Sequence, residues 1–357
     1  MKIGILTFHR ACNYGAVLQC FALQEVLKSL GHDVEVIDYR SHHIEKTYRI
    51  IKTYNGIRTF VRSLLTMRFT YYQQKNFKSF RDTFLNISKS SYRDTNELCL
   101  SNYDCFIIGS DQVWSQRINF GYDDVYWGNF LPGKRKVSYA ASMGGHKPFT
   151  QKEIERINHN LNNFSSISVR EDVLQEELKS IYDRKIINLV LDPTLIAQPQ
   201  VYEQIMVKPQ QQNYVLYYQQ GHHPFTKEIV SNVARQLKCS VIIIAGEKEE
   251  YSVPFKHYTL ANLSVPEFLG LFKYATFVFA SSFHGTAFSI VFEKNFYYVG
   301  NARIERSKSL LNLLGLSDRL IFSDKLVDAV EVDYDLVRDK KTKWIESSLS
   351  YLKCSLE

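Results

Sequence analysis

Residues 2–37 read KIGILTFHRACNYGAVLQCFALQEVLKSLGHDVEVI, and this stretch decides the fold. A short apolar run ends at Leu6, a turn follows, and apolar side chains then recur every three or four residues as far as Leu30, which is the spacing of a buried helix face. Gly31 stops the helix before a second apolar run that ends at Ile37. Strand, helix and strand in this order predict a Rossmann-like opening with a mostly parallel sheet.

Short apolar strands continue to alternate with amphipathic helices, which predicts two α/β domains. The first series of strands is expected at Cys105–Ile108, Val137–Ala140 and Ile167–Val169, and the second at Tyr214–Tyr218, Ser240–Ala245, Thr276–Ala280 and Phe296–Val299. A polar run with two prolines, residues 198–212, separates the two series. We therefore expect one Rossmann-like domain over 1–195, a second over 196–330, and a last helix within 331–357 that packs back across both.

A basic segment interrupts the first domain near residues 41–100. Between Ser41 and Arg93, lysines and arginines are set against only Glu45 and Asp82, and aromatic residues are interleaved with them. The pattern predicts a helical insertion. Its basic face is either simply solvated or meets a lipid head group or an acceptor diphosphate. Nucleic acid is not expected as a partner, because no recognised reading module accompanies the charge.

Composition bounds the class of protein. The chain has 357 residues, of which 45% are hydrophobic and 23% charged, and these values are typical of a globular protein with two cores. Six scattered cysteines without CxxC spacing predict reduced thiols, and the absence of a leader-like start predicts a cytoplasmic protein. No apolar run approaches the roughly 18 residues that a spanning helix needs. Any membrane contact is therefore expected to be peripheral.

Polar residues that follow predicted strands are the candidates for chemistry, because ligands of parallel sheets bind at the carboxyl ends of strands. Asn13 and Tyr14 open the first helix, where Asn13 is either a ligand contact or a helix cap. Asp111, Gln112 and Trp114 follow the strand that ends at Ile108. Asp111 either accepts a proton from a sugar hydroxyl or forms an Asx turn, and Trp114 offers a flat face for a sugar ring.

Two further groups add a histidine and arginines. Arg170 follows the strand that ends at Val169 and is either an anion clamp or part of a surface ion pair. His284 stands in the run Ser281–Thr286, between a strand and an apolar helix, which suits proton transfer more than a structural role. Arg303 and Arg306 follow the next strand as a second anion clamp or as solvated charges. No P-loop, HExxH, EF-hand or GxSxG motif is present, so we expect no catalytic metal.

Several short runs in a fixed order resemble those of the polysaccharide pyruvyl transferase family over nearly the whole chain. They are Asn13–Gln19, Gly109–Trp114, Ser138–Ser142, Val169–Glu171, Asp192–Thr194 and Ser282–Thr286. The resemblance implies an α/β fold similar to B-type glycosyltransferases, with two Rossmann-like domains facing a cleft. It also implies transfer of a pyruvyl group from phosphoenolpyruvate to two hydroxyls of one sugar, giving a cyclic ketal and free phosphate during capsular or exopolysaccharide biosynthesis.

By motif match, the resemblance makes His284 the general acid or base and Arg170 a ligand of the donor's carboxylate or phosphate, and the chemistry of the implied reaction suggests roles for the other candidates. His284 and Asp111 would be the acid and base, in either order. Arg170, Arg306 and Arg303 would hold the donor together with Ser282 and Gly285, and the acceptor would meet Asn13, Tyr14, Gln112 and Trp114. No cofactor is implied beyond phosphoenolpyruvate as substrate. The acceptor is expected to be lipid-linked, at the inner membrane face.

One departure from the family pattern concerns Ser282, because relatives carry an arginine two residues before the motif histidine. Our hypothesis is that Arg306, or else Arg303, supplies the missing charge. Two rival functions stay open. One is a B-type glycosyltransferase that uses a sugar nucleotide, since fold does not determine function. The other is a catalytically degenerate glycan-binding protein, which the serine at 282 motivates.

Overall fold

The computed structural model describes residues 1–51, 56–98, 100, 102–145, 148–221, 226–246, 251–300, 304–322 and 325–357. The chain forms two compact units. Unit 1 comprises Met1–Tyr71, Arg81–Ala197 and Lys343–Glu357, and unit 2 comprises Tyr72–Phe80 and Gln198–Thr342. The predicted boundary after residue 195 lies two residues before the junction at Ala197. The last helix, α14 (Tyr334–Leu356), contributes residues to both units.

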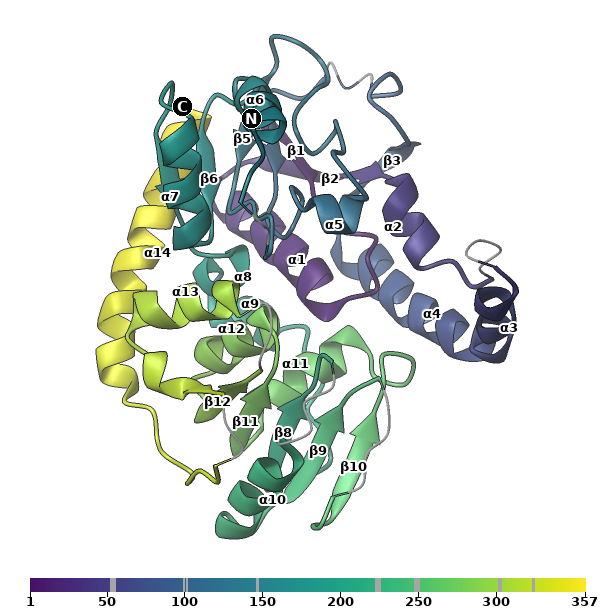
Figure 1. The fold of residues 1–357 in the computed structure, drawn as a ribbon, viewed down its shortest axis with the longest axis vertical. Coiled ribbons are helices and arrows are strands. Elements are labelled where there is room, and N and C mark those ends of the chain that lie inside the picture. The colour runs from purple at the N-terminus through teal and green to yellow at the C-terminus, as the bar shows by residue number, and fades with distance from the viewer. Residues whose placement is uncertain are drawn as a thin grey trace. The chain divides into compact units, whose positions relative to one another are not determined.

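Unit 1 is built on a parallel five-stranded sheet (Figure 1). Its strands are β1 (Lys2–Leu6), β2 (Asp33–Tyr39), β3 (Ile87–Tyr92), β4 (Cys105–Ile108) and β5 (Arg135–Ser138), in the order β3-β2-β1-β4-β5. Two short strands, β6 (Ile167–Val169) and β7 (Ile187–Leu189), pair with each other in parallel. Isolated bridges continue the pairing from β5 to this second sheet. All four residues of β4 are buried, as expected for a parallel strand covered on both faces.

Helices cover the sheet of unit 1. They are α1 (Tyr14–Ser29), α2 (His42–Thr47), α3 (Ile57–Leu65), α5 (Gln116–Asn119), α6 (Gln151–Leu161), α7 (Asp172–Ile181) and α8 (Pro193–Ile196), and α4 (Met67–Phe84) belongs partly to unit 2. Helix α1 is buried over most of its length and contacts α8. The start of the chain thus forms the strand, helix and strand that its apolar spacing predicts.

The basic segment differs from its prediction at one end. His42–Thr47, Ile57–Leu65 and Met67–Phe84 are helical, as α2, α3 and α4, but Ile87–Tyr92 forms strand β3 and pairs with β2 at the edge of the sheet. Its sequence, ISKSSY, is polar because an edge strand leaves most of its side chains in solvent. The predicted insertion near 41–100 therefore returns to the sheet before it ends.

Unit 2 repeats the design with a parallel six-stranded sheet, drawn in green in Figure 1. Its strands are β8 (Tyr214–Tyr218), β9 (Ser240–Ile244), β10 (Phe255–Tyr258), β11 (Phe277–Ala280), β12 (Phe296–Val299) and β13 (Leu320–Ile321), in the order β10-β9-β8-β11-β12-β13. Its helices are α9 (Pro199–Glu203), α10 (Thr226–Gln236), α11 (Val265–Lys273), α12 (Phe283–Val291) and α13 (Glu305–Leu314). Among the described residues, no helix is both long enough and apolar enough to cross a membrane.

The five-stranded and the six-stranded sheet each have one point at which the strand order reverses. In unit 1 it lies between β1 and β4, and in unit 2 between β8 and β11. The loops that leave neighbouring strands at such a point run in opposite directions and open a crevice at the carboxyl ends. The loops after β1, β4, β8 and β11 are therefore the places where a ligand is expected.

Candidate active site

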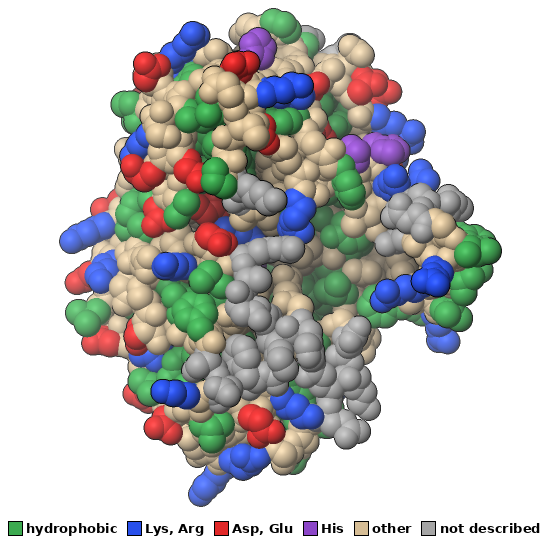
Figure 2. All heavy atoms as spheres, in the orientation of Figure 1, with side chains coloured by type: hydrophobic (Ala, Val, Ile, Leu, Met, Phe, Trp, Pro, Cys, Tyr) green, Lys and Arg blue, Asp and Glu red, His purple; other side chains and the backbone are tan. Residues whose placement is uncertain are grey.

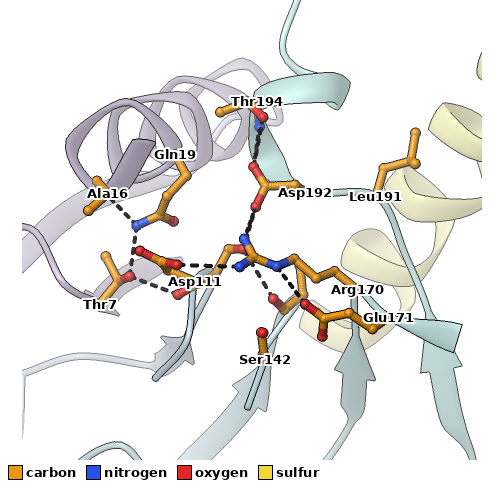
Figure 3. Close-up of polar contacts among 12 residues, drawn as sticks. Thr7, Ala16, Gln19, Asp111, Ser142, Arg170, Glu171, Leu191, Asp192 and Thr194 are labelled. Atoms are coloured by element: carbon orange, nitrogen blue, oxygen red, sulfur yellow. Dashed lines mark hydrogen bonds and ion pairs between the residues drawn. The ribbon is translucent and has the colours of Figure 1, made fainter. Parts of the chain in front are cut away.

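A buried arginine and three carboxylates form a network in unit 1, the Arg170 network, shown in Figure 3. The Arg170 guanidinium donates through Nη1 to Asp192 at 2.7 Å and through Nε to Glu171 at 3.1 Å. Its Nη2 donates to Oδ1 of Asp111 at 3.3 Å. The side chain of Arg170 is 1% exposed. Arg170 therefore does form ion pairs, but they are buried, so the predicted alternative of a surface ion pair is wrong about their location.

The network is held by the carboxyl ends of several strands. Asp192 follows β7, accepts hydrogen bonds from the backbone N–H and hydroxyl of Thr194 at the start of α8, and accepts another from the Ser110 hydroxyl at 2.8 Å. The Ser110 carbonyl in turn accepts from the Thr7 hydroxyl at 2.9 Å, and Gln19 of α1 donates to that hydroxyl at 2.8 Å. The loops after β1, β4, β6 and β7 are thus tied together around Arg170 (Figure 3).

Electrostatics fix the charge state of Arg170. Burial by itself would lower the pKa of the guanidinium, but Glu171, Asp192 and Asp111 outweigh that penalty and raise the pKa above its ordinary value. One guanidinium facing three carboxylates leaves a formal surplus of two negative charges when all are ionised. The three N–H groups described above, on Nε, Nη1 and Nη2 of Arg170, point at protein carboxylates. This geometry suits Arg170 to holding Asp111 in position more than to the predicted direct contact with the pyruvyl-donor substrate.

Asp111 is the member of the network that stands at the strand-order reversal. It follows β4 and is 7% exposed, and its backbone adopts a left-handed conformation with φ of 71°. Its carbonyl accepts from Val113 at 2.8 Å and from Ser142 at 3.0 Å, which fixes the loop. A non-glycine residue held in this region stores strain, and such residues cluster at functional sites. The carboxylate of Asp111 accepts a hydrogen bond from Arg170, whereas the alternative prediction was an Asx turn.

The four residues that were predicted to contact the acceptor sugar differ in how accessible they are. Asn13 caps α1 by accepting from the N–H of Ala16 at 3.2 Å, so the capping alternative is confirmed. Trp114 is 1% exposed and stacks on Trp127 with ring centroids 4.7 Å apart, and Tyr14 is fully buried. These two rings lack the open face that stacking on a sugar requires, because the core gains more from their large apolar area. Gln112 is half-buried in the loop after β4.

His284 lies at the strand-order reversal of unit 2. It stands in the first turn of α12, directly after β11, and its side chain is largely buried with its ring edge-on to Phe283. Ser282 caps the helix by accepting from the N–H of Gly285 at 3.1 Å. The Ser281 hydroxyl accepts from the N–H of Gln220 at 2.6 Å and so joins the loops after β8 and β11.

The other residues that were predicted to hold the pyruvyl-donor substrate are Gly285, Arg306 and Arg303. A Cβ at Gly285 would lie 2.8 Å from the Cβ of Ala280, so this position needs glycine for close packing. Arg306 stands half-buried in the first turn of α13. Burial raises the pKa of Tyr298 in β12, and a hydrogen bond with Ser307 and the positive charge of Arg306 oppose that rise. Arg303 lies outside the described residues.

The part of the chain that the structure describes holds no group of three His, Cys, Asp or Glu side chains arranged around a metal. Sequence reasoning missed Thr7, Gln19 and Ser110 as supports of the network, and it also missed His9 and Arg10. Thr7, His9, Arg10 and Ser110 lie in loops that follow a strand, so that rule applied to every polar residue would have found them, whereas Gln19 lies within helix α1.

Comparison with known proteins completes the description. The family model for polysaccharide pyruvyl transferase matches residues 13–303. A putative UDP-N-acetylglucosamine 2-epimerase from Listeria monocytogenes superposes with a TM-score of 0.50 at 9% identity, covering 98% of this chain and 89% of that one. The UDP-GlcNAc 2-epimerase from Neisseria meningitidis gives a TM-score of 0.47 at 11% identity, with 99% and 94% covered. No curated protein matches the sequence.

These likenesses to solved structures show the fold alone. The two parallel sheets, together with the likeness to the Listeria protein, confirm the predicted α/β class with two Rossmann-like domains. The family match spans most of the chain and includes the runs around Asp111, Arg170 and His284. It confirms the resemblance seen in the motifs, and the chain belongs to the polysaccharide pyruvyl transferase family.

Proposed function

We propose that the protein transfers a pyruvyl group from phosphoenolpyruvate to two hydroxyls of one sugar, forming a cyclic ketal during capsular or exopolysaccharide biosynthesis. The observation that carries the proposal is the family match over residues 13–303, with its motif histidine, His284, standing at the strand-order reversal of unit 2. A polar residue at such a point is where a parallel sheet presents chemistry to a ligand.

The reaction needs an acid and a base, and we assign them to His284 and Asp111. Protonation of the methylene carbon of phosphoenolpyruvate by His284 gives an oxocarbenium-like centre at the adjacent carbon. One sugar hydroxyl attacks that carbon and its proton passes to the Asp111 carboxylate. The C–O bond to the phosphate then breaks, and the proton held by Asp111 passes to the leaving group, which departs as hydrogen phosphate. The second hydroxyl forms the second C–O bond, and its proton returns to the neutral imidazole. Atoms and charges balance without a further reactant.

The donor's negative charge needs a cation near His284, and Arg306 is the residue we propose. Arg306 stands beyond β12, which pairs directly with β11, the strand that leads to His284. Its positive charge opposes the rise that burial causes in the pKa of Tyr298 in β12. Because Ser282 acts as the helix cap at the position where relatives carry arginine, a charge from the neighbouring loop would serve the same purpose.

Phosphate release from phosphoenolpyruvate, with a panel of hexose-terminated lipid diphosphates as acceptors, tests this function. We expect release that depends on acceptor, that is lost in His284→Gln, and that persists in the control His159→Gln, which changes an exposed histidine. If phosphoenolpyruvate neither binds nor releases phosphate, the pyruvyl assignment fails. Hydrolysis of a sugar nucleotide would then identify a glycosyltransferase, and glycan binding without turnover a degenerate relative.

We also propose that α3 brings unit 1 to the inner membrane face, where a lipid-linked acceptor would reside. Exposed apolar side chains gather on α3 and the start of α4, namely Ile57, Val61, Leu64, Leu65 and Met67. Arg58, Arg62 and Arg68 alternate with them in the sequence. Figure 2 shows hydrophobic side chains gathered over this end of the molecule with basic ones beside them. Apolar side chains with flanking arginines suit an anionic lipid surface.

Flotation with vesicles tests the membrane contact. We expect the protein to float with phosphatidylglycerol vesicles and to remain unbound with phosphatidylcholine vesicles. The double variant Ile57→Gln, Leu65→Gln should bind anionic vesicles at least about tenfold more weakly, because burying each side chain contributes roughly 1.5–3 kcal/mol. Val173→Gln, which changes an exposed valine of α7, is the matched control. Equal flotation of all three proteins would refute the role of α3.

A further inference from the structure

A second cluster of charged residues lies at the carboxyl ends of β1 and β2, outside the roles assigned above. Its centre is Asp38, and we call it the Asp38 cluster. Oδ1 of Asp38 accepts from Nη1 of Arg10 at 2.8 Å and lies 3.1 Å from Nε2 of His9. Oδ2 accepts from both Nε and Nη2 of Arg40 at 3.2 Å. The pKa of Asp38 is lowered because these partners outweigh the effect of its burial.

A third arginine, Arg81 of α4, is coupled electrostatically to Arg10 and Asp38 of the same cluster. It is 9% exposed, and its buried Nη1 makes no hydrogen bond to any residue that the structure describes. Burial and then the charge of Arg10 lower the pKa of Arg81, while the carboxylates of Asp82 and Asp38 offset this effect only in part. A buried guanidinium with an unsatisfied N–H is costly unless something else completes it.

Three arginines gather at this cluster. Arg10 and Arg40 contact Asp38, and Arg10 also lies 3.6 Å from Glu45. The charge of Arg81 is offset in part by Asp82, which is exposed, and by Asp38, so the three guanidiniums are matched by three carboxylates only when the exposed Asp82 is counted. Arg10 and Arg40 remain 25% and 34% exposed, so a solute can reach them. Arginine presents a planar fork of N–H donors that matches the oxygens of a phosphate. An anion at this place would accept a hydrogen bond from Nη1 of Arg81 and reduce the repulsion between the guanidiniums.

We propose that the Asp38 cluster is a phosphate-binding site of unit 1, in which Arg10, Arg40 and Arg81 contact the phosphate oxygens. The site stands at the carboxyl ends of parallel strands, where ligands of such sheets bind. Two sources of phosphate exist if the proposed function holds, namely the diphosphate of the lipid-linked acceptor and the phosphate of phosphoenolpyruvate. The site itself does not depend on that function.

Pyrophosphate titration with an optical readout confined to unit 1 tests the site. The three tryptophans of the chain, Trp114, Trp127 and Trp344, all belong to unit 1, so their fluorescence reports its unfolding. We expect pyrophosphate to raise the unfolding midpoint of the wild type, because a ligand that binds only the folded state stabilises it. Arg81→Met and Arg40→Gln should bind pyrophosphate at least about tenfold more weakly. Arg184→Met, which changes an exposed arginine, should match the wild type.

The two variants guard against a folding artefact. Arg40 is the more exposed of the two, so its replacement should leave the fold intact. Arg81→Met removes a buried charge whose Nη1 makes no hydrogen bond to any residue that the structure describes. Unchanged pyrophosphate affinity in both variants would overturn the proposal, whether or not the protein turns over phosphoenolpyruvate. In the turnover assay, a raised KM for acceptor alone assigns the site to the acceptor diphosphate, and a raised KM for phosphoenolpyruvate alone assigns it to the donor.

Discussion

Replacing Arg170 with methionine is expected to lower the free energy of unfolding of unit 1 by about 3–5 kcal/mol, because it leaves buried carboxylates without their cation. Methionine has a similar length and fills the same space with apolar atoms, so the loss reports the charge rather than a cavity. Asp192 is fully buried and Glu171 nearly so, and neither can recover its interaction through water. The loss should therefore be among the largest of any single substitution in this unit.

Urea unfolding followed by tryptophan fluorescence measures this change in unit 1. Arg170→Lys should lie between the wild type and Arg170→Met, because a single ammonium group cannot direct donors at Asp111, Glu171 and Asp192 together. The exposed Arg184→Met should stay within about 0.5 kcal/mol of the wild type. If Arg170→Met lost no more than Arg184→Met, the network would not be what holds these loops.

The pH dependence of the Arg170→Met variant gives a second check on the cause. Carboxyls that lose their cation are disfavoured as charged groups in the folded state, so their folded pKa rises above the unfolded value. Such groups destabilise the fold at high pH and cease to do so as they become protonated. The difference in stability between wild type and variant should therefore shrink as the pH falls from 8 towards 5.

The fold follows from the sequence wherever a strand is buried on both faces. Cys105–Ile108 and Tyr214–Tyr218 are apolar throughout and form β4 and β8 within the predicted limits. The edge strands β3 and β10 escape prediction, because ISKSSY and FKHY carry polar side chains that face solvent. The pattern of apolar residues indicates which side chains are buried. An edge strand is defined by its backbone hydrogen bonds, which the types of its side chains hardly reveal.

The site follows from the sequence less completely, because its geometry depends on residues far apart in the chain. The rule that polar residues after parallel strands form sites selects Asp111, Arg170 and His284 from sequence alone. It does not show that Arg170 bonds Asp192, 22 positions away, or Asp111, 59 positions away. Trp114 illustrates the same limit, since a strand-end aromatic can turn outward to a ligand or inward to the core, and here Trp127 holds it inside.

Replacing Asp111 with asparagine should reduce kcat for pyruvyl transfer by about 10²–10⁴-fold, the usual contribution of a positioned general base. Asparagine keeps an oxygen that can accept the hydrogen bond from Arg170, so the loop after β4 should hold its shape. It also reduces the surplus of negative charge in the Arg170 network, so the unfolding midpoint of unit 1 should be unchanged or higher. Loss of activity without loss of stability is the expected signature.

Glu171→Gln is the matched control for Asp111→Asn, because it removes one carboxylate from the same network and also keeps an acceptor oxygen for Arg170. Both substitutions change the local charge by the same amount, and both residues are largely buried. If Asp111 takes the proton from the sugar hydroxyl, Glu171→Gln should retain kcat within about tenfold of the wild type. Equal losses in the two variants would show that the total charge around Arg170 matters for turnover, and the role of base would then have to pass to a residue outside the network.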